Sequence, residues 1–122
     1  MRRALLVEVS TNEYEVFRSV LAPRGFEVVK ASRDVLDQFL AGSDLVITGI
    51  GSTASSGFYL ASRLQMIRPD LKLVLVSSHP VDHWRERERV EFESLPDGFA
   101  AIVQSPVFPH DLLRAIEMLL PS

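Results

Sequence analysis

The segment from Leu45 to Thr48 is a short apolar run that stops at Gly49, and a helical pattern follows it from Ser56 to Ile67. An apolar run of this length bounded by glycine is typical of a buried strand. A buried strand that leads into a helix is the unit of a parallel α/β sheet. Functional side chains in such sheets lie at the carboxyl ends of the strands. Gly49 therefore stands where a functional side chain is expected.

The alternation of strand and helix patterns continues along the chain. Apolar runs predict five strands, which are Arg3 to Val9, Phe26 to Lys30, Leu45 to Thr48, Leu71 to Val76, and Phe99 to Val103. We expect five βα units joined by right-handed crossovers. The predicted fold class is α/β, a doubly wound parallel sheet with the flavodoxin-like strand order 2-1-3-4-5. Because the chain has 122 residues and is 47% hydrophobic, we expect one domain over residues 1–122.

Caps and helix breakers set the ends of the expected helices. Ser10 stands three residues before Glu13, the spacing of an N-terminal capping box, and Pro23 and Gly25 end that first helix. The stripes predicted to be buried in the second, third and last helices are Val35, Leu36, Phe39 and Leu40; Phe58, Ala61, Leu64 and Ile67; and Leu112, Leu113, Ile116, Leu119 and Leu120.

The connection between the fourth and fifth strands is the least regular part of the pattern. Asp82 to Phe92 is dominated by alternating charges, with a weak apolar stripe. We expect a short solvated helix supported by side-chain ion pairs. Two interpretations of Trp84 and Phe92 stay open. They anchor a docking surface, as exposed aromatic residues often do, or they belong to the core.

Composition excludes several kinds of function. The chain has no cysteine, which excludes disulfides, thiolate metal sites and cysteine nucleophiles. A net charge of −3 argues against bulk attraction to nucleic acid. The basic and apolar start is like that of a signal peptide, but Glu8 interrupts it and no small-residue cleavage site follows. No apolar run approaches the length of a membrane span, so we expect a cytoplasmic protein.

The order and spacing of these residues resemble the receiver (CheY-like) domain of two-component response regulators. The resemblance rests on Asp44 to Gly49, Gly57, Arg68 to Leu71, Leu73 to Ser77 with His79, Gly98 to Pro106, and Asp111 to Ile116. It covers nearly the whole chain, and Leu5 to Glu8 fit the family's first strand more loosely.

The resemblance implies a phosphoacceptor site at the carboxyl ends of the strands. In the family an aspartate after the third strand is the nucleophile, and an acidic pair after the first strand holds Mg²⁺. A lysine and a hydroxyl group contact the phosphoryl oxygens. In this chain the aspartate falls on Gly49 and the lysine on Ser105. The acidic pair falls on Glu8 and Val9, and only the hydroxyl is retained, as Ser77.

These replacements predict a degenerate pseudo-receiver, which keeps the fold and lacks the phosphotransfer chemistry. Because a single carboxylate is a poor Mg²⁺ site, we expect no cofactor, no metal ligand and no catalytic residue, hence no enzyme activity. The resemblance implies a phosphorylation-independent signalling module. Its partner would be a protein such as a histidine kinase, a regulator or an output domain, or a second copy of the chain. We expect no membrane binding and no direct nucleic-acid binding.

The family commonly uses the face made by the fourth helix, the fifth strand and the fifth helix for such contacts. In this chain we expect that face to include Trp84, Phe92, Ile102, Gln104 and Arg114. Ile102 falls where the family usually has an aromatic switch residue.

A second function stays open, in which the space left at Gly49 binds a small ligand or a nucleotide. Small hydroxyl residues follow this position and would suit an anion near the start of the third helix; they are Ser52, Thr53, Ser55 and Ser56. The glycines do not have the spacing of the dinucleotide fingerprint, so this interpretation rests on the vacant position alone.

Overall fold

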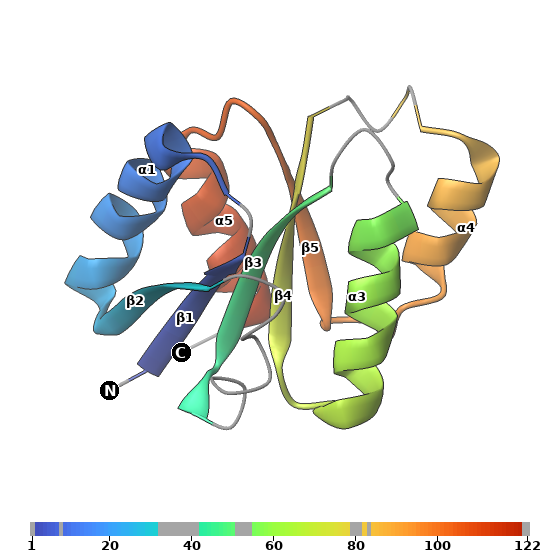
Figure 1. Ribbon diagram of the computed structural model, residues 1–122, viewed down its shortest axis with the longest axis horizontal. Coiled ribbons are helices and arrows are strands. Elements are labelled where there is room, and N and C mark those ends of the chain that lie inside the picture. The colour runs from blue at the N-terminus through green and yellow to red at the C-terminus, as the bar shows by residue number, and fades with distance from the viewer. Residues whose placement is uncertain are drawn as a thin grey trace.

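The computed structural model describes residues 2–7, 9–31, 42–50, 55–78, 82 and 84–120, with the backbone alone described at 50, 55–60, 87 and 88. One parallel sheet of five strands forms its centre, in the order β2-β1-β3-β4-β5 (Figure 1). The strands are β1 (Arg2–Val7), β2 (Phe26–Ala31), β3 (Leu45–Ile50), β4 (Lys72–Ser77) and β5 (Ala100–Gln104). The predicted α/β fold class and strand order are confirmed.

Helices cover both faces of the sheet (Figure 1). On one face lie α1 (Thr11–Leu21) and α5 (Pro109–Leu119), and on the other lie α3 (Ser55–Ile67) and α4 (Glu86–Glu93). A short 3₁₀ turn, η1 (Ala22–Arg24), follows α1. None of the helices in the described part of the chain is long and apolar enough to cross a membrane.

Two hydrophobic clusters hold these layers together. Alternate side chains of β3 enter opposite clusters, so that Leu45 and Ile47 pack with α1 and α5 while Val46 packs with α3 and α4. This is why Leu45, Val46 and Ile47 are all apolar instead of alternating with polar residues.

The ends of α1 follow the sequence prediction. Ser10 is the N-cap, and its Oγ accepts a hydrogen bond from the backbone N–H of Glu13 at 3.2 Å. Gly25 follows η1 with a φ of 90°, a left-handed conformation that glycine adopts without steric cost. The first helix therefore starts and stops through local chemistry that is visible in the sequence.

Several predicted boundaries are wrong by a few residues. The strand β1 ends at Val7 and not at Val9, and β3 continues to Ile50 and does not end at Thr48. It does so because the backbone of Gly49 and Ile50 stays paired with β4. The charged helix α4 starts at Glu86, four residues after the predicted start.

The buried stripe predicted for α3 is partly correct. Ala61 and Leu64 are buried, but Ile67 is 53% exposed. Ile67 is the last residue of α3, where the chain turns toward β4, so helical spacing alone did not reveal its exposure. The side chain of Phe58 and the predicted second helix, 32–41, lie outside what the structure describes.

Candidate functional site

The carboxyl ends of β1, β3, β4 and β5 lie at one edge of the sheet. The register pairs Val7 with Thr48, Gly49 with Val76, Ile50 with Ser77, and Ser77 with Gln104. Just beyond β5, the backbone N–H of Ser105 donates to the carbonyl oxygen of Ser77 at 2.8 Å. This edge, which we call the strand-end site, therefore brings together the predicted positions Val9, Gly49, Ser77 and Ser105. Glu8 lies outside the described residues.

The two positions expected to carry carboxylates present no polar side chain. Gly49 lies within β3, with extended backbone, and is half-buried. Val9 is half-buried and packs against the cluster under α1 and α5. Magnesium requires oxygen ligands, and neither residue supplies a side-chain oxygen. These two described positions therefore supply no side-chain ligand for a magnesium ion.

The retained hydroxyl group of Ser77 is bound inside the protein. Ser77 is 3% exposed, and its Oγ accepts a hydrogen bond from the indole Nε1 of Trp84 at 3.2 Å. Trp84 itself is 8% exposed and belongs to the cluster under α3 and α4. Of the two interpretations of Trp84 that the sequence left open, the structure shows the core position.

Ser105, at the position expected to carry a lysine, is hydrogen-bonded to a carboxylate. Ser105 Oγ donates to Glu13 Oε2 at 2.9 Å, and Ser10 Oγ approaches the other carboxylate oxygen, Glu13 Oε1, at 3.3 Å. Figure 1 shows the start of α1 beside the loop that joins β5 to α5. Glu13 therefore ties α1 to this loop and places a negative charge next to the lysine position.

Sequence reasoning named Glu13 only as a capping residue, although a signal for its second contact was available. In a sheet of order 2-1-3-4-5, the helices after β1 and β5 lie on the same face, so their entrances are neighbours. The contact between Trp84 and Ser77 had no such signal, because Trp84 lies in an irregular connection.

Thr48 is a further polar group at the strand-end site that the sequence did not single out. Its side chain is fully buried, and its Oγ1 has no hydrogen-bond partner among the described residues. Its neighbours in the register are Val7 and Leu75, both fully buried. Burial of an unpaired hydroxyl group costs free energy that a methyl group of the same shape does not.

We expect the substitution Thr48→Val to raise the free energy of unfolding by about 1 kcal/mol, because it removes the buried unpaired hydroxyl and keeps the branched shape. Urea unfolding measures the change. Thr11→Val, at an exposed position of α1, is the matched control and should change stability by less than about 0.5 kcal/mol. A destabilised Thr48→Val protein would show that the hydroxyl is satisfied and stabilising.

The remaining predicted surface residues differ in exposure. Phe92 on α4 and Ile102 in β5 are half-buried and pack against the same cluster as Trp84. Gln104, at the end of β5, and Arg114, on α5, are exposed.

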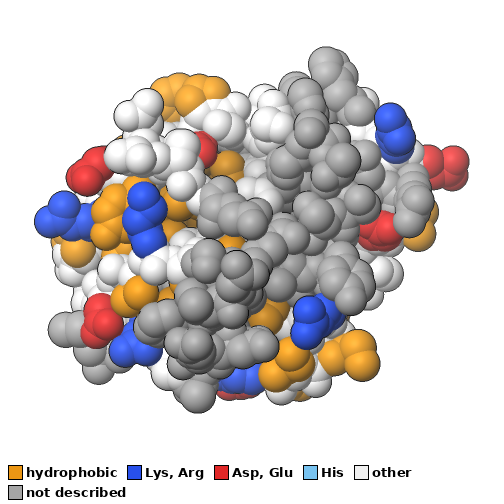
Figure 2. Space-filling view, viewed as in Figure 1, with side chains coloured by type: hydrophobic (Ala, Val, Ile, Leu, Met, Phe, Trp, Pro, Cys, Tyr) orange, Lys and Arg blue, Asp and Glu red, His pale blue; other side chains and the backbone are white. Residues whose placement is uncertain are grey.

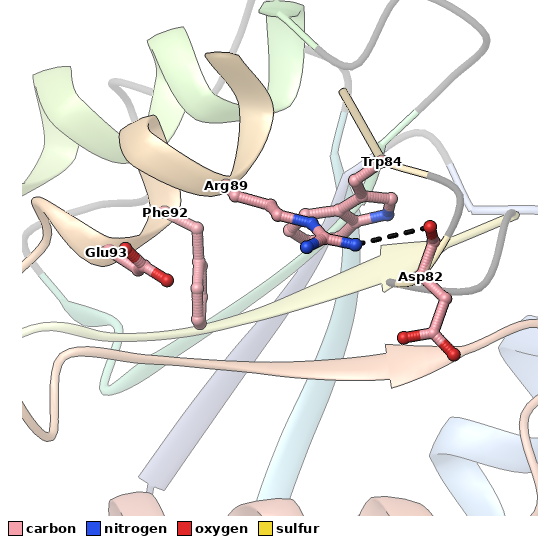
Figure 3. Close-up of a pocket in the computed structure, with 5 residues that line it drawn as sticks. All are labelled: Asp82, Trp84, Arg89, Phe92 and Glu93. Carbon is pink, nitrogen blue, oxygen red and sulfur yellow. Dashed lines mark hydrogen bonds between the residues drawn. The ribbon is translucent and has the colours of Figure 1, made fainter. Parts of the chain in front are cut away.

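A pocket of about 200 Å³ opens beside α4. It is lined by Asp82, Trp84, Arg89, Phe92 and Glu93 (Figure 3). The guanidinium of Arg89 donates to the backbone oxygen of Asp82 at 3.2 Å. In Figure 3 the Arg89 side chain crosses in front of the Trp84 indole. The pocket thus has an aromatic wall and a mixed charged rim.

Charged groups elsewhere in the described part of the chain do not gather into a second site. Among the described residues, no three histidine, cysteine or acidic side chains are close enough to hold a metal ion. Figure 2 shows positive and negative side chains interspersed on the described part of one face. A hydrogen bond from Arg68 at 2.9 Å is the main cause that lowers the pKa of Asp70. Asp70 precedes β4 and is therefore at the opposite edge of the sheet from the strand-end site.

Comparisons with known proteins give matches among solved structures alone. No protein-family model matches the chain, and no curated protein matches it significantly. A response regulator from Thermotoga maritima superposes with a TM-score of 0.79 at 18% identity, over 100% of this chain and 99% of that one. A CheY-like receiver domain protein from Methanospirillum hungatei JF-1 has a TM-score of 0.72 at 22% identity, over 96% and 91%.

The chemotaxis protein CheY4 of Vibrio cholerae is a third match, with a TM-score of 0.75 at 18% identity over 98% of this chain and 99% of that one. At such identities the matches establish the fold. The strand order, the helices on both faces and these superpositions together show that the chain has the receiver (CheY-like) fold.

Proposed function

We propose that this domain is a phosphorylation-independent signalling module, which acts by binding a protein partner or a second copy of itself. The observation that carries the proposal is the state of the two hydroxyl groups at the strand-end site. Ser77 Oγ accepts from Trp84, and Ser105 Oγ donates to Glu13. Both groups are engaged in contacts within the protein, at positions where a receiver binds its phosphoryl group.

Electrostatics at the same edge support the proposal. Transfer of a phosphoryl group requires a nucleophile and positive charge around the phosphoryl oxygens. Gly49 supplies no nucleophile, and Ser105 supplies no charge. The carboxylate of Glu13, which holds Ser105, would repel a phosphoryl group placed there. Position 49 therefore has no carboxylate oxygen to attack a phosphoryl group, and position 105 has no positive charge to stabilise it.

The face of α4, β5 and α5 supports the binding half of the proposal. Gln104 and Arg114 are exposed there. Each helix of this face also carries an exposed apolar side chain, because Val90 on α4 is 58% exposed and Met118 on α5 is 69% exposed. A protein interface commonly combines an apolar core with a polar rim, and the exposed residues of these elements include both kinds.

Incubation with acetyl phosphate and Mg²⁺ tests phosphorylation independence. We expect the intact mass of the protein to stay unchanged, because no carboxylate occupies position 49. A receiver that has its aspartate, treated in parallel, is the positive control. A phosphoryl adduct that hydroxylamine removes, found on any aspartate of this chain, would overturn the proposal.

Solution mass over a concentration series tests whether the partner is a second copy. If it is, the mass rises with concentration, and we expect Val90→Glu to suppress this rise because it buries a charge in the interface. Met66→Glu is the matched control, since Met66 is also an exposed apolar side chain, 81% exposed, but lies on α3. A constant monomer mass would exclude a second copy as the partner and leave a different protein as the proposed one. Equal effects of both variants would place the interface elsewhere.

A further inference from the structure

Trp84 joins two parts of the fold, the end of β4 and the helix α4. Its indole Nε1 bonds to Ser77 Oγ at the end of β4, at 3.2 Å. Its ring meets the ring of Phe92 on α4 edge to face, with centroids 6.1 Å apart and planes at 80°. Figure 3 shows both rings between α4 and the sheet. One buried side chain therefore connects the strand-end site to α4.

The helix α4 depends on such a connection for its position. It has eight residues, a length at which an isolated helix is not stable in water. Its sequence, ERERVEFE, is mostly charged, and Val90 is 58% exposed. Only Phe92, which is half-buried, links α4 to the apolar cluster through its own described side chains. Among the described side chains, the apolar packing of α4 is therefore that of Phe92 and the tryptophan beside it.

We propose that Trp84 is a latch that holds α4 against the end of β4. While the indole is bonded to Ser77, α4 stays docked and the Ser77 hydroxyl is covered. When this bond breaks, Trp84 and the helix α4 move away together as one local unit, and the rest of the sheet stays folded. The latch concerns a motion within the chain, so it stands whether or not the domain is phosphorylated and whichever protein binds it.

The latch predicts that local and global opening can be separated by amide hydrogen exchange. In α4 the amide of Arg89 donates to Arg85 and that of Ser94 donates to Val90, while the amide of Tyr14 in α1 donates to Ser10 on the other face. Ser77→Ala removes the acceptor of the indole. We expect exchange at Arg89 and Ser94 to accelerate about ten- to hundredfold, with much less change at Tyr14.

Matched variants make this test specific. Ser78→Ala changes the exposed neighbouring serine and should leave exchange at Arg89 and Ser94 as in the wild type. Ser77→Thr keeps a hydroxyl and should restore most of the protection. Trp84→Phe removes the donor but keeps an aromatic ring, and it serves as a second variant if Ser77→Ala does not fold. It should accelerate the same two amides.

Fluorescence supplies an independent readout, because Trp84 is the chain's single tryptophan. In Ser77→Ala we expect acrylamide to quench Trp84 more strongly than in the wild type. The proposal is overturned if the amides of α4 exchange at wild-type rates in both Ser77→Ala and Trp84→Phe. It is also overturned if Tyr14 accelerates as much as Arg89 and Ser94, because Ser77 and Trp84 then support only global stability.

Discussion

The substitution Trp84→Ala lowers the free energy of unfolding by about 3–5 kcal/mol, as expected for a large aromatic side chain removed from a core. Trp84 is 8% exposed and contacts Phe92 and Ser77. Its removal leaves a cavity, takes away the edge-to-face contact and removes the donor to Ser77 Oγ. The total free energy of unfolding of a domain of this size is only about 5–15 kcal/mol, so the loss is a large share of its stability.

Thermal and urea unfolding measure this effect, and the melting temperature should fall on the order of 10–20 °C. Phe108→Ala is the control, because Phe108 is also aromatic but is 61% exposed, and its removal should cost less than about 0.5 kcal/mol. Trp84→Phe should lie between the two. Equal stability of the Trp84→Ala and Phe108→Ala proteins would mean that Trp84 does not pack in solution as it does here.

The fold could be predicted from the sequence because its signals are local and repeated. Each strand is an apolar run, most are followed by a helix pattern, and right-handed crossovers then give a doubly wound sheet, for which 2-1-3-4-5 is a common strand order. Ser10 shows the same agreement at a helix end, since its cap depends on residues only three positions away. The errors include boundaries such as the end of β3, where pairing with β4 keeps Gly49 and Ile50 in the strand, and the burial predicted for Ile67, which is 53% exposed.

The contacts of the strand-end site could not be predicted in the same way. Glu13 and Ser105 are 92 residues apart, and their hydrogen bond exists only because α1 and α5 share a face of the sheet. Trp84 lies in a charged segment whose apolar pattern is too weak to predict whether its side chain faces the core or the solvent. Its role follows from the position of Ser77, which periodicity does not provide. Sequence therefore predicted that these positions lie at the strand ends, and tertiary structure determines what the described residues there contact.

On the function proposed above, restoring the receiver's phosphoacceptor residues should enable this domain to accept a phosphoryl group. The variant combines Gly49→Asp, Val9→Asp and Ser105→Lys, which restore a nucleophile, a second carboxylate and a positive charge at the strand-end site. The register and the bond from the Ser105 amide to the Ser77 carbonyl, 2.8 Å, are backbone features that these side-chain changes leave in place. We expect a hydroxylamine-labile adduct after incubation with acetyl phosphate and Mg²⁺, detected by intact mass.

The single and control variants show which part of the chemistry is limiting. Gly49→Asp alone restores the nucleophile without the charges that stabilise the transition state, so its rate should be about 100-fold or more below that of the triple variant. Replacing Gly49→Asp by Gly49→Asn in the triple background keeps the size of the side chain and removes the nucleophile, and it should abolish the adduct. An adduct that persists with the asparagine would lie at some other residue.

Glu13 gives the sharpest test of the rebuilt site. Its carboxylate, which now accepts from Ser105 Oγ at 2.9 Å, would pair with the introduced lysine and draw it away from the phosphoryl group. Adding Glu13→Gln to the triple variant should therefore raise the rate of phosphorylation, whereas Glu15→Gln, an exposed carboxylate of the same helix, should not. If the triple variant forms no adduct with either change, the strand ends do not have the geometry of a phosphoacceptor site, and the absence of the aspartate alone cannot explain the loss of that chemistry.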